Sequence, residues 1–127
     1  MFKPFIILAA VNGFLSVSLG AFAAHGLRAR LEPDLLTTFQ TGAQYHMYHA
    51  LALFGVSVLA LHFPTSTALK LSGYLFLLGI LLFSGSLYLL SLSGIRWLGA
   101  ITPLGGVAFL LAWGTLIWFG ATQNIHT

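Results

Sequence analysis

Apolar residues occur along this chain in four long runs, and short polar segments separate the runs. Each run has about the 20 apolar residues that a helix needs to cross the hydrocarbon core of a membrane. A segment inside lipid must pair its own backbone groups, so each run predicts one transmembrane helix. The predicted spans cover residues 4–24, 41–62, 71–93 and 100–121. We therefore expect an all-α fold, an integral membrane bundle of four transmembrane helices in one domain over residues 1–127.

The first run ends in the stretch AFAAHGLRAR, residues 21–30, whose small residues are similar to a signal-peptide cleavage site. The run is longer than the core of a typical signal peptide, and three comparable runs follow it, so we expect a transmembrane helix. This helix should end near Gly26, since glycine readily adopts the left-handed conformation found just past many helices. His25 then either caps this end or borders a pocket beneath it, and Arg28 and Arg30 lie at the lipid headgroups.

Two prolines mark the starts of later helices. Glu32, Pro33 and Asp34 form a helix-start pattern, so the second helix is expected to begin near Pro33, before the membrane core. The stretch ITPLGG at the start of the fourth span allows two interpretations. Pro103 either interrupts the helix beside a cavity or lies harmlessly in its first turn.

Composition supports the membrane assignment. Hydrophobic residues make up 58% of the chain and charged residues 6%, whereas a typical soluble domain has about 25% charged residues. With so few charges, lipid is expected to be the main solvent.

The formal net charge of +3 comes without the clustered basic face that nucleic-acid binding requires. The sequence contains no cysteine, which excludes disulfides and thiolate metal sites.

Basic residues predict the orientation in the membrane. Four spans place both termini on one side, which we call the Lys70 end and which also carries Lys3. The opposite side, the Arg96 end, carries Arg28, Arg30 and Arg96. Because cytoplasmic loops are enriched in Lys and Arg, we expect both termini to lie outside the cytoplasm. The difference of three basic residues against two is small, so insertion in both orientations also fits the sequence.

Four motifs occur in a recognisable order: AFAAHGL, QYHMYHALALFG, FSGSLYLLSLSG and ITPLGGVAFLLAW. In this order they resemble the small four-span membrane family that includes bacterial YgdD and YwdK and vertebrate transmembrane protein 256. The first motif reads GAFAAHGL here, with Ala23 at the usual glycine position, and the resemblance covers almost the whole chain. The resemblance implies a four-helix membrane fold. It does not indicate a reaction, because the function of that family is unknown.

Polar residues within the spans gather at the midplane and toward the Arg96 end. A polar side chain inside a membrane is costly, so each one needs a partner or a purpose. The polar residues of the second span share roughly one half of that helix and are expected to turn inward. They would line a pocket that opens at the Arg96 end. The candidate pocket or ligand residues are Asn12, Ser16, His25, Gln44, Tyr45, His46, Tyr48, His49, Ser84, Ser86, Tyr88, Arg96, Thr102, Gly105 and Gly106.

The two histidines of the second span lie three residues apart. That spacing allows two metal ligands, or a haem ligand and its neighbour. No predicted span contains a carboxylate that would complete such a site. The simpler interpretation is that His46 and His49 are neutral and form hydrogen bonds to other helices, so we expect no cofactor.

Three functions fit these observations. The first is a homo-oligomer that binds or passes a small solute, an ion or a lipid headgroup. The second is a non-catalytic accessory or scaffold subunit of a membrane complex, and the third is a haem or redox protein. An enzyme is not expected, since no nucleophile, base and orienting group occur together. The expected partners are the lipid bilayer of a bacterial inner membrane, further copies of the chain, and a membrane protein or lipid headgroup, but not nucleic acid.

Overall fold

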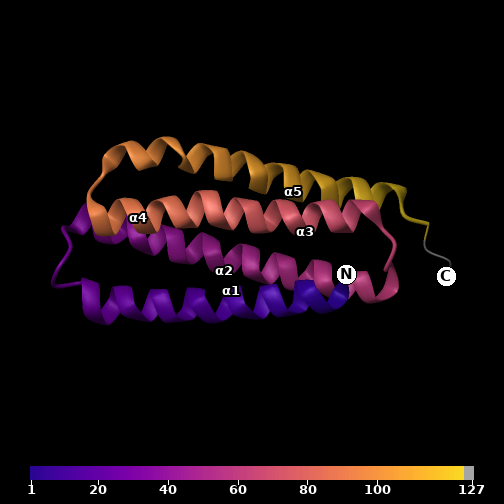
Figure 1. Ribbon diagram of the computed structural model, residues 1–127, viewed down its shortest axis with the longest axis horizontal. Helices are drawn as coiled ribbons and strands as arrows, with labels where there is room; N and C mark the ends of the chain where they lie inside the picture. Colours follow the sequence, from indigo (N-terminus) through magenta and orange to yellow (C-terminus); the bar gives the residue numbers. More distant parts are fainter. Residues whose placement is uncertain (125–127) are drawn as a thin grey trace.

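Four helical rods make up residues 1–124, which are the residues that the computed structural model describes (Figure 1). The first and third rods each contain one π-helical turn, and a 3-10 turn precedes the last helix. In chain order the elements are α1 (Phe2–Phe22) with the π-turn η1 (Ala23–Leu27); α2 (Pro33–His62); α3 (Thr67–Gly79), the π-turn η2 (Ile80–Ser84) and α4 (Gly85–Ser93); and the 3-10 turn η3 (Arg96–Ala100) with α5 (Thr102–Thr122).

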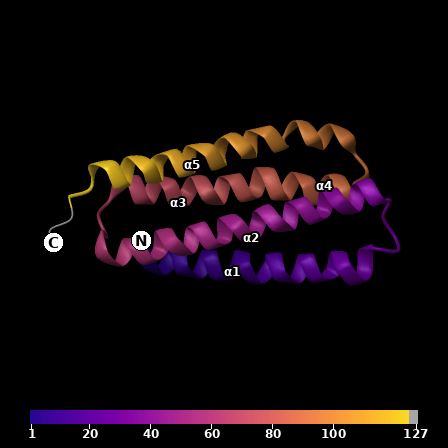
Figure 2. The ribbon, with the colours of Figure 1, turned by 180° about the vertical axis from the view of Figure 1, so that it is seen from behind.

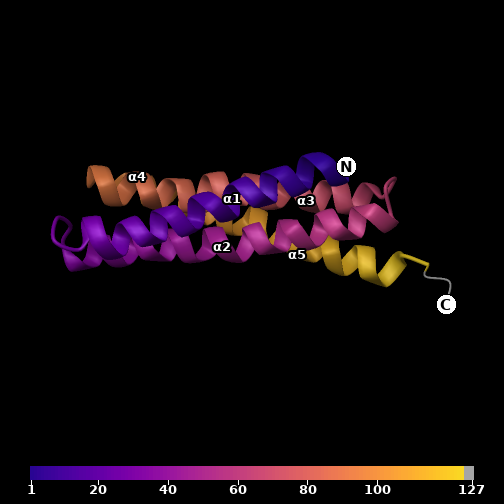
Figure 3. The same cartoon turned by 90° about the horizontal axis from the view of Figure 1, so that it is seen from below.

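Successive rods run in opposite directions and lie side by side. α1 packs along α2, α2 packs along α3 and α4, and α3 packs along α5 (Figure 1 and Figure 2). α1 crosses the bundle obliquely (Figure 3), so Phe5 near its start contacts Tyr74 of α3 while its later part stays on α2. The start of the chain and the end of α5 lie together at the Lys70 end, as four spans require.

The predicted all-α membrane bundle is confirmed. Within residues 1–124, three rods are long and apolar enough to cross a membrane: Phe2–Leu27, Thr67–Ser93 and Arg96–Thr122. The remaining rod, α2, has 30 residues and is less apolar, because its first half carries Asp34 and a series of Thr, Gln, Tyr and His residues. α2 is therefore the helix whose surroundings in a membrane need an explanation.

Both proline predictions concern helix starts. α2 begins at Pro33 with Asp34 in its first turn, which confirms the expected start. Pro103 lies in the first turn of α5, where its missing N–H leaves no hydrogen bond broken. Of the two interpretations of Pro103, the simpler one is correct.

The predicted role of Gly26 is wrong. Gly26 lies inside the π-turn η1, and within residues 1–124 the only residue with a positive φ is Gly94, which ends α4 at φ 73°. A Cβ on Gly26 would lie 2.7 Å from the ring of Phe22. Glycine at this position therefore makes room for an aromatic ring of the same helix instead of reversing the chain.

Close packing holds α5 against the third rod. A Cβ on Gly105 would lie 2.3 Å from the backbone nitrogen of Phe83, and one on Gly79 would lie 2.3 Å from the ring of Phe109. Small residues at such points let helix backbones approach within a membrane, where dispersion contacts drive association. The buried aromatic rings of Phe5, Phe76, Phe109 and Phe119 fill the space between the rods.

Candidate functional site

A chain of hydrogen bonds joins three rods at Asn12, His46 and Tyr88. The Asn12 amide nitrogen donates to the Leu8 carbonyl at 2.8 Å, so the amide oxygen is the acceptor that faces Nε2 of His46 at 2.8 Å. His46 therefore donates from Nε2, and its Nδ1 accepts from the Tyr88 hydroxyl at 2.9 Å. The imidazole is 4% exposed, and both of its nitrogens are used within the protein.

Serine hydroxyls add further links between rods. Ser16 of α1 donates to the Ala43 carbonyl at 2.8 Å, and Ser84 of η2 donates to the Gly42 carbonyl at 2.8 Å. Two consecutive carbonyls of α2 thus receive hydrogen bonds from the rods on either side. The hydroxyls of Ser86 and Thr102 lie 2.6 Å apart and join α4 to α5.

His49 is held separately from His46. Its Nδ1 donates to the Tyr45 carbonyl at 2.7 Å, and its Nε2 accepts from the indole N–H of Trp113 at 3.2 Å. The ring also stacks on Phe109 with the ring centroids 3.5 Å apart. Neither nitrogen offers a free lone pair, and residues 1–124 contain no group of three metal-binding side chains. The arrangement matches the simpler interpretation, in which the histidines bond to their neighbours.

Gln44, Tyr45 and Tyr48 of α2 face outward, so the prediction that the polar residues of this helix turn inward is wrong for these three, although His46 and His49 are buried. Gln44 is exposed, and Tyr45 and Tyr48 are 38% and 49% exposed. The face that packs against other rods carries the small residues Gly42 and Ala43 together with the two histidines. Small residues allow closer packing, so this face is buried, and the Gln and Tyr side chains remain on the surface.

Two of the charged groups at the Arg96 end, Arg96 and Asp34, form an ion pair. Nη2 of Arg96 lies 3.1 Å from Oδ2 of Asp34, and both side chains are exposed. The hydrogen bond from Arg96 holds the pKa of the Asp34 carboxyl below its usual range. His25 is exposed, and its Nδ1 lies 2.9 Å from the Ala21 carbonyl. The structure therefore does not join His25 and Arg96 to the midplane residues around one pocket.

Two surface grooves lie near the midplane candidates. One, of about 460 Å³, is lined by Tyr45, His49, Trp113 and Gly106, and the other, of about 490 Å³, includes Ser86 and Tyr88. Both are lined mainly by apolar atoms and open outward between the rods. Gly105 lies apart from this surface, because it is buried against Phe83.

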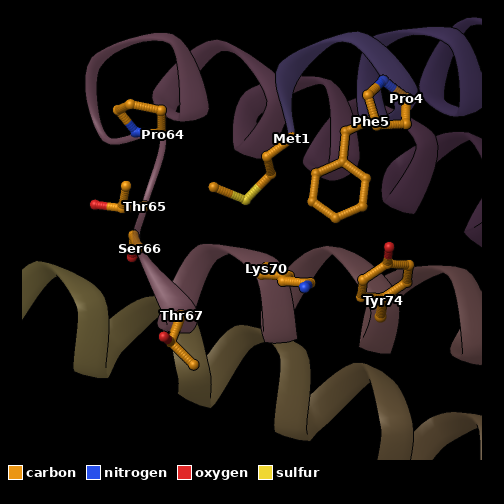
Figure 4. Close-up of a pocket in the computed structure, with 9 residues that line it drawn as sticks. All are labelled: Met1, Pro4, Phe5, Pro64, Thr65, Ser66, Thr67, Lys70 and Tyr74. Atoms are coloured by element: carbon orange, nitrogen blue, oxygen red, sulfur yellow. The ribbon is translucent and has the colours of Figure 1, made fainter.

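A polar pocket of about 460 Å³ lies at the Lys70 end, between the start of α1 and the start of α3 (Figure 4). We call it the Lys70 pocket. Figure 4 shows Met1 and Phe5 on one side and Lys70 and Tyr74 on the other. Its lining residues are Met1, Pro4, Phe5, Pro64, Thr65, Ser66, Thr67, Lys70 and Tyr74.

Several polar groups of the Lys70 pocket have no partner in the protein. Within residues 1–124, the Lys70 ammonium and the hydroxyls of Thr65, Thr67 and Tyr74 form no side-chain hydrogen bond. The Ser66 hydroxyl, in contrast, caps α3 by accepting from the Leu69 N–H at 3.2 Å. Sequence reasoning missed this pocket. The available signal was a lysine beside the hydroxyl-rich segment PTST, in a half of the chain without acidic residues.

Comparison with known proteins agrees with the resemblance seen in the motifs. A family model described as "Protein of unknown function (DUF423)" matches residues 19–106. The chain is 54% identical to the UPF0382 membrane protein YwdK of Bacillus subtilis over 89 residues, which is 70% of this chain and 72% of that protein. It is 45% identical to a UPF0382 membrane protein of Haemophilus influenzae over 91 residues, 72% of each chain.

A third relative is the UPF0382 inner membrane protein YgdD of Escherichia coli, 41% identical over 86 residues, which is 68% of this chain and 65% of that protein. No solved structure matches the chain. The family model covers well over half of the chain and includes the first three motifs and the start of the fourth, in their order. This chain therefore belongs to the DUF423 family of membrane proteins.

Proposed function

We propose that this protein is a non-catalytic membrane protein that binds the phosphate of an anionic lipid headgroup in the Lys70 pocket. The observation that carries the proposal is the contrast between two sets of polar groups. The polar side chains buried at the midplane bond to one another, whereas the ammonium and three hydroxyls around the Lys70 pocket have no partner within residues 1–124.

Charge favours an anionic ligand. The sequence has only two acidic residues, Glu32 and Asp34, and both lie at the Arg96 end. No Asp or Glu side chain therefore lies near Lys70. Lipid phosphates are the abundant anions at a membrane surface, and basic pockets at helix ends are suited to bind them. A zwitterionic headgroup fits less well, because nothing here would receive its cation.

The shape and chemistry of the Lys70 pocket suit a headgroup. An ammonium supplies three N–H donors and each hydroxyl supplies one, while a phosphate offers several acceptor oxygens. The volume of about 460 Å³ lies within the range of small-ligand sites, about 300–1,000 Å³. Phe5, Pro4 and Met1 give an apolar wall against which the glycerol backbone and the first part of an acyl chain can pack.

Binding has more support than passage or redox chemistry. A path for a solute or ion through the bundle needs polar groups that can exchange partners, and the midplane donors and acceptors buried inside the bundle are already paired. A haem role would need a histidine nitrogen that can reach iron. Both nitrogens of His46 and of His49 are engaged in hydrogen bonds. Nothing in the geometry favours these two alternatives.

The test is the thermal stabilisation of purified, delipidated protein by phosphatidylglycerol. A ligand present at about 100 times its Kd stabilises the folded state by about 2.7 kcal/mol, which corresponds to a shift of several degrees in Tm. We expect Lys70→Gln to lose most of this shift. Lys3→Gln is the matched control, because Lys3 lies at the same end outside the Lys70 pocket and should keep the shift.

Two further ligands, tested in the same assay, show which chemical group the Lys70 pocket binds. Phosphatidylcholine is expected to give a smaller shift than phosphatidylglycerol, and inorganic phosphate alone a smaller one still. An equal shift with phosphate would indicate a free anion instead of a lipid. Equal losses in the two lysine variants would mean that general surface charge is responsible, and would contradict a specific site.

A further inference from the structure

Five polar side chains form an exposed stripe along the first half of α2. They follow the three- and four-residue spacing that places residues on one side of a helix. Thr41 is partly exposed, and the other four are exposed. We call this stripe the α2 polar face, and its members are Thr37, Gln40, Thr41, Gln44 and Tyr48.

Part of the α2 polar face lies at the depth of the hydrocarbon core. At a rise of about 1.5 Å per residue, α2 is about 45 Å long, and it exceeds a core of about 30 Å by about 7.5 Å at each end when centred. Gln44 then lies about 9 Å inside the core, and Tyr48 about 15 Å inside it. Lipid headgroups and bulk water do not reach this depth.

The hydrogen-bonding capacity of these two side chains is only partly used. Gln44 donates from Nε2 to the Tyr48 hydroxyl oxygen at 2.6 Å. Within residues 1–124, the Gln44 carbonyl oxygen and the Tyr48 O–H proton then have no partner. Acyl chains cannot supply one, and polar groups left unpaired in lipid are costly. The polar side chains buried inside the bundle are all paired, so the buried part of the fold avoids this cost.

We propose that the same face of a second copy covers the α2 polar face, in a dimer whose two-fold axis runs along the membrane normal. Each copy has one unpaired acceptor on Gln44 and one unpaired donor on Tyr48. The Gln44 amide and the Tyr48 hydroxyl meet within one copy, so these two end groups lie at nearly the same depth although the residues are one helical turn apart. A two-fold axis places the acceptor of each copy against the donor of the other, so the leftover groups pair reciprocally.

The continuation of this face also suits a second helix. Leu51 and Gly55 follow Tyr48 on the same side of α2, and both are exposed. A Cβ on Gly55 would have open space around it, so no group of the same chain fills the position. Two α2 helices can therefore approach closely at Gly55. The face carries no charge between Leu35 and Leu61, so like charges do not oppose the contact.

Disulfide cross-linking tests this interface, since the chain contains no natural cysteine. Leu51→Cys places a thiol in the face, and Leu111→Cys on α5 is the matched control, because the two leucines are 60% and 55% exposed. Both variants are reconstituted into phosphatidylcholine vesicles and oxidised. We expect covalent dimers from Leu51→Cys at a yield several times that of Leu111→Cys. Equal yields would overturn the proposal.

A second variant separates the specific contact from random collision. Gln44→Leu removes the polar group with an apolar residue that lipid tolerates, so the monomer should still fold. We expect Gln44→Leu to lower the dimerisation constant measured with Leu51→Cys by about tenfold, the effect of losing about 1.4 kcal/mol of hydrogen bonding. An unchanged constant would overturn the pairing. Cross-links that form only with another protein in native membranes, and none in vesicles, would replace the second copy with a different partner.

Discussion

At the scale of single residues, this protein pairs its buried polar groups with one another. His46, Asn12 and Tyr88 come from three rods. The His46 ring donates to the Asn12 amide oxygen and accepts from the Tyr88 hydroxyl. Ser16 and Ser84 do the same for two carbonyls of α2. Hydrogen bonds between helices in a membrane contribute about 0.6–2 kcal/mol each. They also fix the relative rotation of the rods, because the partners meet only in one register.

Removing one hydroxyl from this network should destabilise the bundle. Tyr88→Phe leaves the Nδ1 of His46 buried without a donor, so we expect the free energy of unfolding in lipid-free detergent micelles to fall by about 1–2 kcal/mol. Tyr74→Phe is the control, since the Tyr74 hydroxyl is exposed in the Lys70 pocket and should change stability little. Equal stabilities for the two variants would show that the His46 bond contributes nothing measurable.

At the scale of elements, the rods differ in how closely they approach. α5 rests on η2 at Gly105, where no side chain fits between the two backbones. The next residue, Gly106, lines the surface groove beside Tyr45 and His49, and a Cβ at this position would have open space around it. Two adjacent glycines in one helix therefore have opposite roles, and only one of them is required by packing.

Alanine substitutions at these glycines should act in opposite directions. Gly105→Ala forces the Phe83 backbone away, and we expect a loss of about 1–3 kcal/mol of stability, typical of overpacking. Gly106→Ala meets nothing and should raise stability by up to about 1 kcal/mol, because alanine favours helix over glycine. Denaturant titration of both variants in the same detergent provides the comparison. A stable Gly105→Ala protein would mean that α5 and η2 lie further apart than described.

At the scale of the whole molecule, charge is distributed unevenly along the bundle. Both acidic residues lie at the Arg96 end, where Asp34 pairs with Arg96, while the charged side chains of the Lys70 end are the two lysines Lys3 and Lys70. The orientation in the membrane stays a prediction from the three basic residues against two. A parallel dimer through α2 adds a constraint. Because Gln44 lies off the membrane centre, two copies in opposite orientations would not bring their Gln44 side chains together.

Single cysteines can report the orientation. We expect Thr65→Cys, at the Lys70 end, to react from outside intact cells with a membrane-impermeant maleimide, and Arg30→Cys to react only after the membrane is opened. The reason is the larger number of Lys and Arg residues at the Arg96 end. Labelling of both variants from outside would indicate insertion in both orientations and would contradict a single one.

The sequence predicts the rods well and their faces poorly. Apolar runs determine where a helix can cross lipid, and Pro33 marks a start that depends only on local chemistry. Which side of α2 turns inward depends instead on the fit of Gly42 and Ala43 against other rods, and periodicity alone does not contain that information. The Lys70 pocket was missed for the same reason. Residues near position 5 meet residues near position 70 only because α1 crosses the bundle obliquely.

The directed hydrogen bonds of the two histidines have one more consequence. His46 carries its ring proton on Nε2, because it donates to Asn12, whereas His49 carries its proton on Nδ1, because it donates to the Tyr45 carbonyl. Two imidazoles three residues apart on one helix are thus fixed as opposite tautomers. Their nitrogen resonances should differ in a characteristic way, so one spectrum can report separately on contacts of α2 with α1 and with α5.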